Sequence, residues 1–440
     1  MFLYQIVGNR KKLILTVLVG IILLGVYGTE GLNAAASPAA WASAGTRSNR
    51  NGQEPWAAFI RQGELWVKIN GQESRLIREK SVARPRWSAD GTMLAYTLRE
   101  KECWIYQLKS KRALKLSDQS QSYQWSPARN ELAIQEGKLL SVYDGSMIED
   151  SVQLKPVISG VGNYSWKPDG RGFLISTQAE LLPSGWTQVQ LYDVPADAEL
   201  QPSKVKLLFT LPAQDEEFFA IGTSPFKWSS NQQWISFVAT PTASLSADGN
   251  TLCMLSRDGK RFYTFDSMLN AFNWFKWAPS AERLANIAGS GRMANLNKKL
   301  AIHTAPVSDS KVLTPAGFAD RDLAWIDNDR LVVARSKEEA WNEDEGKRPM
   351  PKLMEQGIAG QNARTLSDPP PKWGDFFPYV NPDATKLTWI RTDRKRADVW
   401  IRELAEGPAK VFIKHIDMPA SYYDRWDWSD VLSWYPAEHE

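Results

Sequence analysis

Short apolar strands and polar turns alternate along most of the chain, and one arrangement of the two recurs. Residues 85–96 read PRWSADGTMLAY, in which an apolar segment ends at a tryptophan, a polar turn follows, and an alternating apolar segment returns. Asp and Gly can adopt the positive φ angles that a tight reversal requires. The stretch therefore predicts a β-hairpin.

Seven further stretches repeat this hairpin. They are centred on Trp125, Trp166, Trp228, Trp277, Trp325, Val380 (in the place of the tryptophan) and Trp428. Neighbouring copies are mostly about 38 to 62 residues apart, which is the repeat length of β-propeller blades. Most copies are followed by a second pair of apolar strands, such as CWIYQL and ALKLSD after the first. Each repeat thus predicts a blade of four antiparallel strands, here called a to d in chain order.

The two ends of the repeat region complement each other. Residues 56–78 read as strands b to d without a preceding hairpin strand, whereas the C-terminal YYDRWDWSDVLSWY reads as a hairpin strand with no partners after it. Joining them would remove exposed sheet edges. We predict an all-β fold, a single propeller of four-stranded blades over residues 55–436. It has eight blades, with seven as the alternative, and the N- and C-terminal strands close the ring.

The first residues predict a targeting segment. Arg10, Lys11 and Lys12 precede an apolar run that ends at residue 28, and this run is short for a membrane span of about 20 residues. We predict a hydrophobic helix that serves as a signal peptide or signal anchor over residues 1–28, a flexible linker over 29–54, and a tail over 437–440. Basic residues before the apolar run place the remainder outside the cytoplasm, either secreted or anchored to the cytoplasmic membrane by this segment alone.

Composition narrows the function. The net charge of +3 without a basic block argues against a nucleic-acid partner. The 3 histidines are scattered and the 2 cysteines form no CxxC pair, so we predict no metal site and no cofactor. Cys103 and Cys253 lie in blades too far apart for a disulfide, which requires Cα atoms within about 7 Å. We expect two free, packed thiols.

The hairpin and its Asp90-Gly91 and Asp169-Gly170 turns resemble those of the TolB-like propeller repeats, relatives of the WD-repeat propellers. The resemblance covers residues 56–436 and does not include the N-terminal α/β domain of TolB, so that the Tol–Pal role of TolB does not carry over. It implies a propeller fold and a non-catalytic interaction scaffold of the cell envelope. Such repeats are specific for a fold but weakly indicative of function.

Long loops locate the candidate binding face, because the b–c and d–a connections of a propeller share one face. The b–c loops are long in four successive blades, at residues 178–188, 240–250, 289–299 and 336–351, and the d–a loop 211–224 falls in the same sector. Loops that exceed a minimal turn are often functional. The candidate binding residues on these loops and on the next basic tip are Trp186, Phe218, Phe219, Arg292, Trp341, Arg394 and Arg396. The alternative is that the loops pack on each other and cover the rim.

Two charged segments lie among these loops. Five carboxylates gather in residues 338–346, namely Glu338, Glu339, Glu343, Asp344 and Glu345. The ordered Asp spacing of a calcium loop is absent, so we interpret them as a solvated acidic loop. The basic tip Arg394-Lys395-Arg396 is either a solvated turn, a partner of the acidic loop, or a contact for an anionic polymer or lipid.

These observations predict a non-catalytic, exported and monomeric binding scaffold that presents its long loops to an envelope protein or wall polymer. The chain is predicted not to be an enzyme. The alternative is a propeller enzyme, either a lyase or glycosidase acting on an envelope polymer or the gating propeller of a peptidase. A gating propeller needs a hydrolase with a G-x-S-x-G elbow, and AGSGRM at residues 288–293 lacks that spacing.

Overall fold

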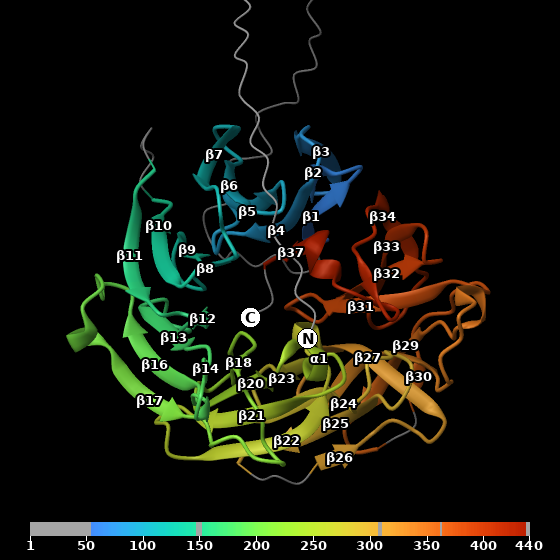
Figure 1. The fold of residues 1–440 in the computed structure, drawn as a ribbon. Helices are drawn as coiled ribbons and strands as arrows, with labels where there is room; N and C mark the ends of the chain where they lie inside the picture. The colour runs from blue at the N-terminus through green and yellow to red at the C-terminus, as the bar shows by residue number, and fades with distance from the viewer. Residues whose placement is uncertain (1–53, 147–151, 307–309, 361–362, 437–440) are drawn as a thin grey trace, which may run out of the picture. The chain divides into compact units, whose positions relative to one another are not determined.

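The computed structural model describes residues 54–146, 152–306, 310–360 and 363–436. These residues form eight antiparallel sheets, the blades of a β-propeller, which follow one another around a common centre (Figure 1). The prediction of an all-β propeller with eight blades is confirmed, and seven blades are excluded. The predicted helix of residues 1–28 and the linker lie outside the described residues, apart from the last residue of the linker.

The first four blades follow the chain from residue 82. Blade 1 contains β4 (Val82–Trp87), β5 (Met93–Leu98), β6 (Glu102–Gln107) and β7 (Arg112–Ser117). Blade 2 contains β8 (Ser122–Trp125), β9 (Glu131–Glu136), β10 (Leu139–Asp144) and β11 (Leu154–Ser159). Blade 3 contains β12 (Asn163–Trp166), β13 (Gly172–Ser176), β16 (Gln190–Pro195) and β17 (Lys206–Thr210). In blade 4, β18 (Gly222–Thr223) and β19 (Lys227–Trp228) both pair with β20 (Trp234–Thr240), which β21 (Asn250–Ser256) and β22 (Phe262–Met268) follow.

The last four blades complete the propeller. Blade 5 contains β23 (Phe275–Trp277), β24 (Arg283–Ala288), β25 (Lys299–Thr304) and β26 (Ser310–Val312). Blade 6 contains β27 (Phe318–Trp325), β28 (Arg330–Lys337), β29 (Lys352–Gly357) and β30 (Arg364–Thr365). Blade 7 contains β31 (Gly374–Val380), β32 (Lys386–Thr392), β33 (Ala397–Glu403) and β34 (Lys410–Ile416). Blade 8 joins β37 (Leu432–Tyr435) to β1 (Trp56–Arg61), β2 (Glu64–Ile69) and β3 (Gln72–Ile77).

Connections carry the remaining short elements. Two hairpins of two-residue strands occur, one formed by β14 (Leu181–Leu182) with β15 (Gly185–Trp186) and one by β35 (Ser421–Tyr422) with β36 (Arg425–Trp426). The helical turns are α1 (Ala243–Ser246), η2 (Pro202–Lys204), η3 (Phe272–Trp274), η4 (Glu345–Lys347) and η5 (Trp428–Asp430). No helix within the described ranges has the length and apolar character to cross a membrane.

Several of the repeated tryptophans link successive blades. The indole N–H of Trp125 donates to the carbonyl oxygen of Arg86 in the preceding blade at 3.1 Å, and that of Trp166 donates to Gln124 at 3.0 Å. The same bond joins Trp325 to Lys276 at 3.0 Å. Because a large ring is buried together with a satisfied N–H, the motif fixes both packing and register between neighbouring blades.

The eighth repeat is centred on Trp434, which corrects its prediction at Trp428. Trp434 pairs with Ala57 of β1, in the register that joins Trp87 to Leu94 in blade 1. The indole of Trp87 accordingly donates to the carbonyl oxygen of Ser433 at 3.2 Å. Trp428 instead begins η5. Ser429 and Asp430 after Trp428 resemble the hairpin turn in sequence, but they belong to a 3₁₀ turn. The Asp427 side chain caps this turn by accepting from the Ser429 N–H at 3.1 Å.

The two cysteines agree with the prediction of free, packed thiols. Cys103 in β6 and Cys253 in β21 are both free and fully buried. Burial in apolar surroundings raises the pKa of both thiols well above its usual range.

Candidate functional site

The connection between β34 and β37, residues 417–431, reaches the long loops of neighbouring blades. We call it the terminal loop. It contains the hairpin of β35 and β36 and the turn η5. Sequence analysis interpreted this stretch as a propeller strand, whereas the structure shows a long d–a connection. Its alternation of aromatic and charged residues, SYYDRWDWSD, suits a loop that packs on one side and contacts charges on the other.

Three blades contribute side chains that hold the terminal loop. The Tyr423 ring lies 5.0 Å from the ring of Trp341 in the long loop of blade 6 and 5.8 Å from the Arg292 guanidinium in the long loop of blade 5. Arg321 of β27 donates from Nη1 to the carbonyl oxygen of Asp424 at 3.0 Å. Arg425 donates to the carbonyl oxygen of Asn270 at 3.5 Å.

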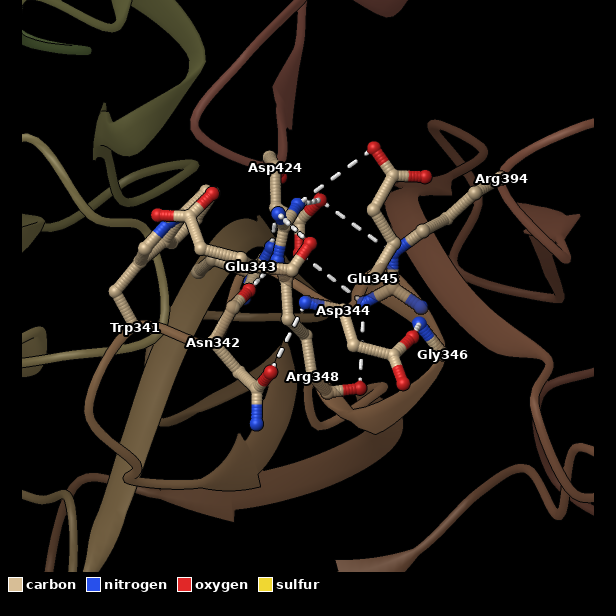
Figure 2. Close-up of polar contacts among 10 residues, drawn as sticks. Trp341, Asn342, Glu343, Asp344, Glu345, Gly346, Arg348, Arg394 and Asp424 are labelled. Carbon is tan, nitrogen blue, oxygen red and sulfur yellow. Dashed lines mark hydrogen bonds and ion pairs between the residues drawn. The ribbon is translucent and has the colours of Figure 1, made fainter.

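Asp424 is the centre of these contacts (Figure 2). Its carboxylate accepts from Arg348 Nη1 at 3.2 Å and from Arg394 Nη2 at 3.1 Å. The side chains of Asp424, Arg348 and Arg394 are only 5%, 7% and 8% exposed. At this depth solvent screens the charges weakly, so the pairs fix the terminal loop to the loops of blades 6 and 7.

The acidic loop of blade 6 supports Arg348 through backbone carbonyl groups and through a longer ion pair, in which Glu345 lies 3.8 Å from Arg348 Nη1. Arg348 Nε donates to the carbonyl oxygen of Asn342 at 2.6 Å, and the guanidinium lies 3.7 Å from the centre of the Trp341 ring. Asp344 caps η4 by accepting from the Gly346 N–H at 3.0 Å (Figure 2). Within the described part of the chain, no group of three or more acidic, histidine or cysteine side chains is arranged to hold a metal ion.

The seven predicted binding residues fall into separate places. Arg292, Trp341 and Arg394 gather around the terminal loop. Arg292 is held there by its ion pair with Asp248, and Arg394 pairs with Asp424 rather than with a carboxylate of the acidic loop. Sequence reasoning missed Asp424, because the stretch that contains it was interpreted as a strand.

The other four predicted residues lie elsewhere. Phe218 is 6% exposed and belongs to the apolar core of blades 3 and 4, on which Trp186 also packs. Phe219, next to it, is partly buried. Arg396 is 65% exposed and pairs with Asp393 at 2.9 Å. Trp186 and Phe218 therefore fit the alternative considered from sequence, in which the loops pack on each other.

A narrow recess lies beneath the terminal loop. It is lined on its apolar side by Trp274, Phe376, Trp426 and Trp428 and on its polar side by Arg321 and Arg425, with Asp322 and Asp424 beside them. Asp322 is buried, and its two oxygens accept from the Trp274 indole at 2.7 Å and from the Phe377 N–H at 2.9 Å. Burial raises the pKa of this carboxyl.

A buried lysine adds positive charge nearby. Lys298 Nζ donates to the carbonyl oxygens of Ser290 and Gly291, both at 2.8 Å. Burial, together with repulsion from Arg321 and Arg425, lowers the pKa of Lys298 to about 8. The carboxylates of Glu338 and Asp248 act in the opposite direction on this pKa.

The histidines offer no nucleophile pair within the described ranges. His303 Nε2 lies 2.9 Å from Asp266 Oδ2 and 3.1 Å from Asn286 Oδ1, while its Nδ1 has no hydrogen-bond partner there. His415 is exposed and lies near Asp398. Neither ring contacts a serine hydroxyl or a thiol, so no Ser–His arrangement for acyl transfer is formed by these residues.

Comparison with known proteins identifies similar folds among solved peptidases. No family model matches the chain, and no curated protein matches it. A solved structure of a prolyl endopeptidase shares 14% identity with a TM-score of 0.51 over 77% of this chain and 50% of that chain. A puromycin hydrolase shares 13% identity with a TM-score of 0.48, over 84% of this chain and 55% of the other. A puromycin-hydrolysing peptidase of Mycobacterium tuberculosis shares 14% identity with a TM-score of 0.46, over 83% of this chain and 54% of the other.

This chain therefore spans about half the length of the solved proteins that it matches. At this identity the likeness establishes the propeller fold. It also contradicts the prediction of a non-catalytic envelope scaffold and the prediction that the chain is not an enzyme, because the matched prolyl endopeptidase is a peptidase. The prediction counted the missing G-x-S-x-G elbow against a peptidase. The resemblance to TolB-like repeats stays a prediction.

Proposed function

We propose that this chain is the propeller part of a peptidase-type enzyme and receives peptides on the face that carries the terminal loop. The fold likeness to a prolyl endopeptidase supports the enzyme class. The chemical step is assigned to a hydrolase part outside the described residues, since those residues form no nucleophile and base pair. The propeller supplies binding and selection.

One observation carries the proposal: this face already holds a peptide segment, which is part of the chain itself. Residues 421–426 lie on it as a short hairpin. Arg321 binds a backbone carbonyl of that hairpin, Trp341 packs on its tyrosine ring, and Arg348 with Arg394 binds its carboxylate. Backbone donors, aromatic surface and charge-assisted bonds are the groups by which proteins hold peptides.

The test uses the full-length chain and fluorogenic peptides, including proline-containing ones. Binding is followed by fluorescence anisotropy and cleavage by mass spectrometry of the products. We expect peptide binding that weakens in Trp341→Ala, which removes aromatic surface from the face. Trp104→Ala, at a partly buried tryptophan of β6 in blade 1, is the matched control and should bind as the wild type does. A chain that neither binds nor cleaves any peptide contradicts the proposal.

Two further proposals concern the chain ends. The pairing of β1 with β37, including Trp56 with Tyr435 and Phe59 with Leu432, supports closure of the ring by the N- and C-terminal strands. The apolar run after Arg10, Lys11 and Lys12 supports export, or anchoring to the cytoplasmic membrane, through residues 1–28.

A further inference from the structure

The recess beneath the terminal loop is small and has a partly open mouth. Its cavity volume is about 10 Å³, which is room for about one water molecule or one ligand atom of that size. Arg425 and Trp426 on the terminal loop are both only partly buried. The recess therefore admits a single acceptor atom, such as one oxygen of a ligand whose remainder lies outside the mouth.

One hydrogen-bond donor in the recess wall, on Arg321, is buried and has no acceptor among the described residues. Arg321 is 3% exposed, and a register shift between Arg321 and Leu323 interrupts the pairing of β27 with β28 at this point. Its Nη1 is bonded to the Asp424 carbonyl oxygen, but its Nη2 has no hydrogen-bond partner among the described residues. A buried donor of a charged group that lacks a partner is costly, so a ligand acceptor at Nη2 would be strongly favoured.

The two carboxylates beside the recess already accept hydrogen bonds from groups other than the guanidinium groups of Arg321 and Arg425. Asp424 is bound by Arg348 and Arg394, and Asp322 accepts from an indole and a backbone N–H. Within the described part of the chain, neither Arg321 nor Arg425 forms an ion pair with a carboxylate. The two guanidinium groups thus line one recess together with four aromatic rings. Asp322 and Asp424 attract Arg321, and Asp427 attracts Arg425. Within the described residues, none of these carboxylates is hydrogen-bonded to either guanidinium group. Guanidinium groups match the geometry of carboxylates.

We propose that the recess binds the C-terminal carboxylate of a peptide, with Arg321 Nη2 as the buried donor and Arg425 at the mouth. The inference rests on the proposed function and deepens it, because it names the substrate class as peptides with a free C-terminus. The terminal loop contributes Arg425 and Trp426 to the wall, so it forms part of the site.

The experiment compares two forms of one ligand on the full-length chain. A pool of random hexapeptides, labelled at the N-terminus, is prepared with a free C-terminal acid and, separately, with a C-terminal amide. Both pools are titrated by fluorescence anisotropy against the wild type, Arg321→Gln and Arg425→Gln. Arg171→Gln, at an exposed arginine in the turn between β12 and β13, is the charge-matched control. Acetate at constant ionic strength is the competitor that represents a free small carboxylate.

We expect the acid pool to bind the wild type and the control about 10- to 100-fold more tightly than the amide pool, the range for a charge-assisted bond. In Arg425→Gln and Arg321→Gln the ratio should fall toward one, and acetate should compete with the acid pool. Arg425 is partly exposed and forms no ion pair within the described residues, so its variant keeps the test decisive where Arg321→Gln does not fold.

The other outcomes separate the two hypotheses. Equal binding of acid and amide pools by the wild type overturns the carboxylate site and leaves the proposed function standing. Binding of neither pool overturns both. A melting temperature that acetate raises in the wild type but not in Arg425→Gln, without binding of either pool, overturns the peptide assignment in favour of a free small carboxylate.

Discussion

Replacement of Asp424 by Asn tests whether a buried charge cluster holds the terminal loop. The change keeps the shape of the side chain but removes the buried carboxylate that Arg348 and Arg394 share, at sites that are 7% and 8% exposed. Arg348 then keeps its 3.8 Å pair with the exposed Glu345. Breaking a buried pair costs about 3 to 5 kcal/mol, because the remaining charges stay desolvated. The amide oxygen of Asn still accepts one hydrogen bond, so we expect a loss near the lower end, about 3 kcal/mol.

Asp393→Asn provides the matched control. Asp393 lies 2.9 Å from Arg396, which is 65% exposed, and an exposed pair of this kind contributes at most about 1 kcal/mol. Unfolding by denaturant of the wild type and both variants gives the two losses, and hydrogen exchange over residues 417–431 shows whether the loss is local to the terminal loop. If Asp424→Asn unfolds at the same denaturant concentration as Asp393→Asn, and exchange in residues 417–431 is unchanged, the reasoning is wrong.

Three further predictions follow from buried groups elsewhere. The pKa of Lys298 is lowered to about 8 from about 10.4 in the unfolded chain. Between these two pH values the unfolded chain binds more protons at this lysine than the folded chain does. The stability of the wild type relative to Lys298→Met should therefore rise from pH 8 to pH 10 in denaturant titrations. Cys103 and Cys253 should not react with a thiol reagent at pH 8 in the native protein, and both should react after denaturation, since each is fully buried. Gly91→Ala should lower the free energy of unfolding by more than the roughly 1 kcal/mol that a left-handed backbone costs, because its Cβ would lie 2.7 Å from the Tyr435 ring. Gly71→Ala is the control, since Gly71 has a φ of +80° and a Cβ there would have no atom within 4 Å. In the same unfolding assay Gly71→Ala should lose only the roughly 1 kcal/mol of the left-handed backbone.

The fold could be predicted from sequence because its signal repeats. The polar turn and the alternating strand recur along the chain, and a tryptophan occupies the repeat position in every blade but blade 7, where Val380 takes its place. The physical reason is local, because an indole that donates to the preceding blade, as in five of the blades, needs the same register each time. The prediction failed at Trp428, because three tryptophans within nine residues, Trp426, Trp428 and Trp434, are candidates for one place in the pattern. Only the pairing of β37 with β1, a contact far apart in sequence, selects Trp434.

The site was less predictable, because it depends on which loops meet. Arg292, Trp341 and Arg394 come together only through the terminal loop, whose contacts with them span from 30 residues in sequence, for Arg394 and Asp424, to 131 for Arg292 and Tyr423 (423 − 292). Phe218 was selected as a loop aromatic, but its side chain is buried in the apolar core of blades 3 and 4. A linear pattern records that a loop is long and aromatic, but not whether its rings face solvent or a neighbour.

The terminal loop divides the arginines of this face into two kinds, and this division links its stability to its proposed use. Arg348 and Arg394 are satisfied by Asp424 and anchor the loop. Arg321 donates from Nη1 to a backbone carbonyl of the loop, and its Nη2 has no hydrogen-bond partner within the described residues. A loop held only for stability would gain from satisfying that last donor, since burying it unpaired opposes folding. The unpaired donor is therefore the position at which an acceptor that enters the recess would gain the most from a hydrogen bond.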